Sequence, residues 1–111
     1  MKSEIYLKSS HLIIPAEISN QVLKGCNSVY VAYKEDLNLI LVSPKTNTWF
    51  PKLHSSLEFI LKNKDLHGTK SIAIHEIFID HDLESSDKTL ICSINQEQNF
   101  LKIELPNFNS V

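Results

Sequence analysis

The sequence predicts one small α+β protein that is mainly β. Several runs alternate apolar and polar residues with a period of two, as in residues 4–8 and 101–105, which is typical of half-buried strands. The helical patterns are few and short. A length of 111 residues, with 42% apolar and 22% charged residues, fits an ordinary globular chain with a core of its own.

The first elements are two strands. Ile5 and Leu7 alternate with polar neighbours and predict a strand over residues 4–8. Ser9 and Ser10 interrupt it, and the apolar run 11–14 predicts the next strand.

A short helix is predicted after these strands. Pro15 suits the first position of a helix, and Glu17 places a carboxylate at its positive end. Gly25 is a natural C-terminal stop. About two turns are too short to be stable alone, so packing must hold this helix.

A hairpin is predicted next. Residues 29–34 alternate, whereas residues 37–42 are almost continuously apolar, which predicts a second strand buried on both faces. Residues 44–47 end the unit.

This order of elements resembles the AbrB-type swapped-hairpin domain (the AbrB, MazE and MraZ group). Ile14-Pro15-Ala16-Glu17-Ile18 matches the end of that family's first strands and its helix, and Gly25 and the hairpin 29–42 match the family's turn and hairpin. The resemblance covers residues 5–44 and implies a swapped-hairpin-like half of a β-barrel, closed by an intertwined homodimer. We therefore expect an AbrB-like unit over 1–44. We expect 45–111 to add a short helix and a three-stranded antiparallel part, packed with it as one compact domain.

The family's DNA-contacting positions are mostly changed. Ser9-Ser10-His11 stands where the family has a basic pair, and Ser19-Asn20 follows Ile18 where the family tends to have Arg. All 11 basic residues are lysines and the net charge is −2, which disfavours DNA as a partner because arginine is the usual fork for bases and phosphates. The residues available for DNA contact are Lys2, Lys8, Lys24, Lys34, Ser9, Ser10, Ser19 and Asn20.

The second part is predicted to hold a connector, a helix and strands. Residues 44–54 form the connector, and Ser55 with Glu58 is a capping-box pattern that predicts a helix over 56–64. Residues 70–82 alternate and predict a long strand. A hairpin is predicted from 89–94 and 100–105. No convincing internal repeat is found in the sequence.

Charge is divided between the two parts. Residues 1–64 hold eight lysines and five acids (+3), and residues 65–111 hold three lysines and eight acids (−5). Opposite charges favour two functional faces or head-to-tail attraction between subunits, while the alternative is ordinary solvated loop charge. Trp49 and Phe50 are either partner anchors or a cap on the core. The candidate partner-binding residues are Trp49, Phe50, Glu76, Asp80, Asp82, Glu84 and Asp87.

Catalytic and metal chemistry has one candidate segment, the predicted strand His75–Asp82. Asp80 and Asp82 would lie about 7 Å apart in a strand, near enough for a hard cation. Yet His75 and His81 would be about 20 Å apart, and no calcium-loop spacing is present. No phosphate-binding glycine loop or nucleophile motif occurs. We therefore predict no cofactor, no metal and no catalysis.

The sequence also predicts where the protein works. The start of the chain has no apolar signal region, no run is long enough to cross a membrane, and Cys26 and Cys92 fit no metal spacing. A cytoplasmic protein with reduced thiols is expected.

These observations support three functional hypotheses. The leading one is a non-catalytic, homodimeric binding or regulatory module that recruits a protein partner. The alternatives are an AbrB-like DNA-binding regulator or antitoxin, and a small enzyme or metal-binding protein that uses the His75–Asp82 strand.

Overall fold

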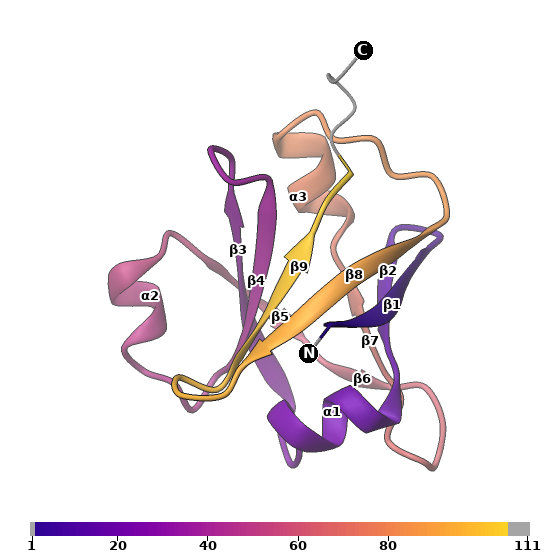
Figure 1. Cartoon of the computed structure of the whole chain (residues 1–111), viewed down its shortest axis with the longest axis vertical. Helices are drawn as coiled ribbons and strands as arrows, with labels where there is room; N and C mark the ends of the chain where they lie inside the picture. Colours follow the sequence, from indigo (N-terminus) through magenta and orange to yellow (C-terminus); the bar gives the residue numbers. More distant parts are fainter. Residues whose placement is uncertain (1, 107–111) are drawn as a thin grey trace.

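Strands dominate the computed structural model, which describes residues 2–106 (Figure 1). No helix in this range has both the length and the apolar character needed to cross a membrane. The strands are β1 (Lys2–Lys8), β2 (His11–Ile14), β3 (Ser28–Lys34), β4 (Leu39–Pro44), β5 (Leu57–Ile60), β6 (Lys62–Asn63), β7 (Lys70–Ala73), β8 (Lys88–Asn95) and β9 (Phe100–Glu104). The helices are α1 (Ala16–Val22), α2 (Phe50–Leu53) and α3 (His75–Asp80).

All nine strands belong to one antiparallel sheet that curls into a nearly closed barrel. Their order is β5-β3-β4-β9-β8-β1-β2-β7-β6. The two end strands, β5 and β6, are consecutive in the chain with only Leu61 between them. The Leu61 amide donates to the Asn27 carbonyl at 2.9 Å and so prolongs the β5–β3 pairing. One bent segment therefore joins both ends of the sheet, and few strand edges are left open.

The main core fills the barrel. Alternate residues of the strands point inward, such as Ile5 and Leu7 of β1 or Ile40 and Val42 of β4, all 0–1% exposed. The two longer helices contribute buried side chains at opposite ends of the barrel, α1 at one and α3 at the other (Figure 1). Cys92 packs in this core as a small apolar residue.

A second, smaller core lies outside the barrel. Phe50 of α2 packs with Ala32, Leu41 and Phe100, which β3, β4 and β9 turn away from the barrel interior. Trp49 is half-buried against this cluster. The connector between the two predicted parts therefore covers the outer face of the sheet and is not a free linker.

The barrel is built from two repeats, which corrects the expectation of none. The order β2-α1-β3-β4 recurs as β7-α3-β8-β9, and β5 with β6 takes the place of β1. The strand registers repeat as well. The pair Val31↔Val42 shifted by 61 residues becomes Cys92↔Ile103, which is a pair in the β8–β9 ladder.

The repeats are related by a pseudo-twofold axis. Where the repeats meet, Leu12 pairs with Ile72 and Leu41 with Lys102, separations of 60 and 61 residues that match equivalent positions. Equivalent residues that face each other in antiparallel strands place a twofold axis between them. We expected a homodimer because half a barrel would leave strand edges unpaired. Here one chain supplies both halves, and those edges pair within the chain. The homodimer itself stays a prediction.

The helix predicted over 56–64 is wrong. Leu57–Ile60 and Lys62–Asn63 are strands, and Val29 and Val31 of β3 pair with Phe59 and Leu57. A short apolar pattern fits both a helix and a strand, and here pairing to β3 and β7 decides the outcome.

The long strand predicted over 70–82 is also wrong beyond Ala73. The Ile74 carbonyl accepts hydrogen bonds from the amides of Ile77 and Phe78, which opens α3. Ile77 and Phe78 are then buried together, although a strand would place these neighbours on opposite faces. The segment His75–Asp82, on which the enzyme and metal hypothesis depended, is therefore mostly helical.

The turn between β1 and β2 offers a stability test. Ser9 and Ser10 have φ values of 49° and 62°, the left-handed pair of a tight type I′ turn, in which glycine is favoured at the second position. We expect Ser10→Gly to stabilise the protein by about 0.5–1 kcal/mol in urea unfolding. Ser93→Gly, within β8, should destabilise it by a similar amount. A loss of stability in Ser10→Gly would contradict the turn geometry.

Candidate functional site, an acidic cleft at one end of the barrel

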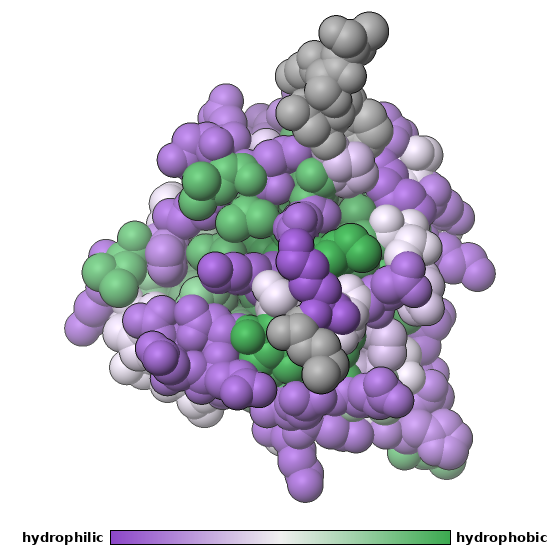
Figure 2. Space-filling model, in the orientation of Figure 1, coloured by the Kyte–Doolittle hydropathy of each residue, from purple (hydrophilic) through white to green (hydrophobic). Residues whose placement is uncertain are grey.

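A cleft of about 670 Å³ lies at the barrel end that carries α3. Its lining includes residues of the β3–β4 turn and of the segment after α3. These two segments lie at the same end of the barrel (Figure 1). In Figure 2, hydrophobic side chains reach the surface near this turn, with hydrophilic residues around them. We call it the acidic cleft because its charged residues are Glu35, Asp36, Asp82, Glu84 and Lys88.

Carboxylates from two distant segments meet at its rim. Glu35 and Asp36 lie on the β3–β4 turn and are exposed, and Asp82 and Glu84 lie in the segment between α3 and β8. With Lys88 as the one cation of the lining, the four carboxylates leave a net charge of −3 with histidine neutral. The rim therefore favours a positively charged ligand.

The floor of the cleft is apolar. It is formed by core side chains where the barrel ends, among them Leu7, Phe78 and Leu90, which are 1–3% exposed. Leu83 and Leu105 complete the floor and are partly buried. A ligand that fits must combine positive charge with apolar surface.

Tyr33 and His81 form the aromatic wall. Their rings are 4.6 Å apart between centroids, tilted by 52°. Burial and the nearby Glu35 carboxylate raise the pKa of Tyr33, so its hydroxyl stays protonated and donates to Asn38 Oδ1 at 3.3 Å. Such a ring can also accept a cation against its face.

Asn38 ties the β3–β4 turn to the end of β9. Its Nδ2 donates to the carbonyls of Leu105 at 3.0 Å and Pro106 at 3.2 Å. The Leu105 amide in turn donates to the Asn38 carbonyl at 3.1 Å. The left-handed φ of 54° at Asn38 suits asparagine, and these bonds hold the acidic turn in place.

Glu84 is held ionised by its neighbours. The Lys88 ammonium at 2.6 Å, with the hydroxyl and amide of Ser86 at 2.7 Å, lowers the pKa of Glu84 to about 2. Its carboxylate therefore carries charge into the cleft across the whole range near neutral pH.

This shift gives a measurable pH dependence. Because the folded-state pKa lies below the ordinary value, Glu84 adds stability above pH 4.5 that is lost as the pH falls towards 2. We expect side-chain carboxyl NMR to give a midpoint near pH 2. Lys88→Met should move the Glu84 midpoint upwards, towards 4.5. An unchanged midpoint in the variant would contradict the assigned cause.

The five acidic residues among the predicted partner-binding residues divide into three groups. Asp82 and Glu84 line the acidic cleft. Glu76 and Asp80 are exposed on α3, four residues apart and so on one helix face. Asp87 accepts a hydrogen bond from the Ser9 amide at 2.9 Å.

The aromatic pair of the connector turns inward. Phe50 is fully buried, so its ring is not available to a partner, and Trp49 packs edge-on against Phe50 and Phe100 with centroids 5.7 and 6.2 Å away. Of the two alternatives given for this pair, a cap on a core is the one that fits Phe50.

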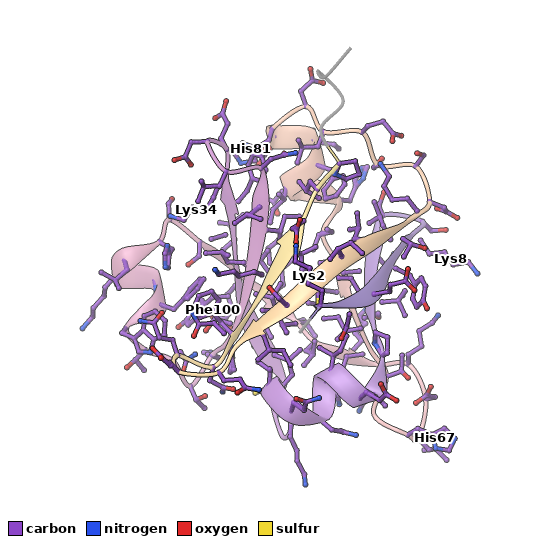
Figure 3. The ribbon with its side chains drawn as sticks, in the orientation of Figure 1. Lys2, Lys8, Lys34, His67, His81 and Phe100 are labelled. Atoms are coloured by element: carbon purple, nitrogen blue, oxygen red, sulfur yellow. The ribbon has the colours of Figure 1, made fainter. Side chains whose placement is uncertain are left out.

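The predicted DNA-contact residues do not gather on one face. In Figure 3, Lys2, Lys8 and Lys34 point to separate parts of the surface. Lys2 pairs with Glu104 at 2.7 Å, Ser19 is fully buried, and Asn20 lies against Gly68. Ser9 and Ser10 form the β1–β2 turn, and Lys24 lies at the opposite barrel end from α3. DNA binding stays a prediction.

Metal-ligating side chains do not assemble in the part of the chain that the structure describes. Within residues 2–106, no three histidine, cysteine, aspartate or glutamate side chains come close enough to hold an ion together.

Two of the four rim carboxylates could be predicted as binding residues from the sequence. The acidic run near residue 80 predicts Asp82 and Glu84 as partner-binding residues, whereas Glu35, Asp36 and Tyr33 are predicted only as parts of a hairpin. Nothing in the sequence near residue 35 points to residue 84; only the barrel brings them together.

Comparison with known proteins adds no family. No protein-family model, curated protein or solved structure matches this chain. The resemblance to AbrB-type domains therefore stays a hypothesis carried by residues 5–44.

Proposed function

We propose that the protein is a non-catalytic binding module whose acidic cleft recruits a basic segment of a protein partner. The observation that carries the proposal is the meeting of Glu35 and Asp36 with Asp82 and Glu84 above an apolar floor. These residues come from segments more than 40 positions apart in the sequence, so it is the fold that places their negative charges in one cleft.

The shape and lining of the cleft favour a peptide segment. A volume of about 670 Å³ accommodates several side chains, within the usual range of ligand clefts. Lysine or arginine suits the carboxylates and the Tyr33 ring, and a leucine-like side chain suits the floor at Leu7 and Phe78.

A nucleic-acid partner does not suit this cleft. Phosphates would meet four carboxylates there, and like charges disfavour that contact. A protein partner is also what the leading hypothesis from the sequence expects, and the identity of that partner would decide any regulatory role.

The test is a direct titration with a defined probe. We would follow the fluorescence anisotropy of a labelled peptide of lysine and leucine residues, with a glutamate-leucine peptide as its control. We expect saturable binding of the lysine peptide that weakens as salt rises, and no binding of the control. Equal binding of both peptides, or of neither, would overturn the proposal.

A further inference from the structure

A second cleft, of about 470 Å³, occupies the position in the first repeat that the acidic cleft occupies in the second. Five lining pairs are related by the same shift of 61 residues: Asn38 with Asn99, Leu83 with Val22, Lys88 with Asn27, Leu105 with Pro44, and Pro106 with Lys45. The pseudo-twofold axis therefore relates the two clefts.

The charges of the two clefts are opposite. The second cleft has two charged lining residues, Lys24 and Lys45, and no acidic one, so we call it the lysine cleft. Lys45 pairs with Glu58 at 3.0 Å. Lys24 is exposed on the loop after α1, and no ion pair of its side chain is found within residues 2–106.

The two clefts lie at opposite ends of the barrel. The β3–β4 turn and α3 mark the acidic end, and α1 with the β8–β9 turn marks the other end (Figure 1). The four rim carboxylates and the two lysines of the lysine cleft therefore lie at opposite ends of the barrel.

We propose that copies of this chain associate head to tail, with the Lys24 loop of one copy in the acidic cleft of the next. The inference rests on the proposed function and names a second copy as a partner of the same cleft. Lys24 supplies the cation, and the four rim carboxylates supply the site.

Such a contact joins two different surfaces. It does not close on two copies but grows into chains or rings, unlike an intertwined homodimer. Because exposed ion pairs contribute little each, the association is weak, dependent on concentration and sensitive to salt.

Sedimentation velocity of the whole protein over a range of concentrations provides the test. We expect the average mass to rise with concentration at low salt and to fall back to that of a monomer at high salt. Lys24→Glu alone and Glu35→Lys/Asp36→Lys alone should both remain monomeric. The exposed residue Lys8 lies outside both clefts, so Lys8→Glu should associate like the parent protein.

Mixing the two monomeric variants is the decisive step. The first keeps an intact acidic cleft and the second keeps an intact Lys24 loop, so we expect the mixture to form complexes. No complex in the mixture, association of either variant alone, or a stable dimer that ignores salt would overturn the head-to-tail contact.

Failure here can be told apart from failure of the proposed function. A protein that stays monomeric at every concentration yet binds the lysine peptide keeps the cleft as a site and loses only the second copy as its occupant. A protein that does neither loses both proposals.

Discussion

Replacing Phe50 with alanine is expected to destabilise the protein by about 3–5 kcal/mol. The Phe50 ring is fully buried and contacts the rings of Tyr30, Trp49, His54 and Phe100, with centroids 4.7–6.4 Å away. Truncation removes these contacts and leaves a cavity between α2 and the outer face of the sheet. For a domain of this size the loss is a large part of the total stability.

Urea unfolding followed by circular dichroism measures this effect. Leu53 lies on the same helix and is 68% exposed, so Leu53→Ala is a matched control that should change stability by less than about 0.5 kcal/mol. If Phe50→Ala costs less than about 1 kcal/mol, then α2 is not packed on the barrel as described.

Removing charge from the acidic rim is expected to weaken binding of the lysine peptide about tenfold at low salt. The variant is Glu35→Gln/Asp36→Asn/Asp82→Asn, which keeps the size of each side chain. Each exposed ion pair contributes up to about 1 kcal/mol, so three pairs whose effects add only in part reach about the 1.4 kcal/mol of a tenfold change. All three residues are exposed, so the fold should be unchanged.

The pseudo-twofold axis supplies the control for this experiment. Glu97 on the β8–β9 turn is the equivalent of Asp36, shifted by 61 residues, and it does not line the acidic cleft. Glu97→Gln changes the net charge by the same amount as Asp36→Asn but should leave peptide affinity nearly unchanged. Equal losses in both variants would mean that net charge governs binding, and not the cleft.

Much of the fold could be predicted from local patterns. The strands near residues 4–8 and 11–14, the helix after Pro15 and both hairpins are confirmed, because alternation and the proline and glycine signals act over a few residues. The second strand of the first hairpin is buried nearly throughout, as its apolar run predicts.

The repeat leaves only a faint trace in the sequence. Glu4-Ile5-Tyr6-Leu7-Lys8 and Glu58-Phe59-Ile60-Leu61-Lys62 share Glu, Leu and Lys at equivalent positions. The capping-box pattern at Ser55 and Glu58 favours a helix locally, and only pairing with β3 and β7 makes the segment a bent strand. Because residues 4–8 form a strand, the match of residues 58–62 to them favours a strand in the second segment as well.

The acidic cleft could be predicted from the sequence only in part. Its rim joins a turn of the first repeat to a loop of the second, and that proximity results from the pairing of β4 with β9 and β8 with β1. Long-range register of this kind has no local signature in one sequence.

The most direct test of the central claim is an amide NMR titration of the whole protein with the lysine peptide at low salt. We expect shift changes confined to the β3–β4 turn, to residues 81–84 and to residues 105–106, where the chain lines the acidic cleft. Changes spread evenly over the exposed acidic residues, or centred on the β8–β9 turn, would contradict a binding site in the acidic cleft.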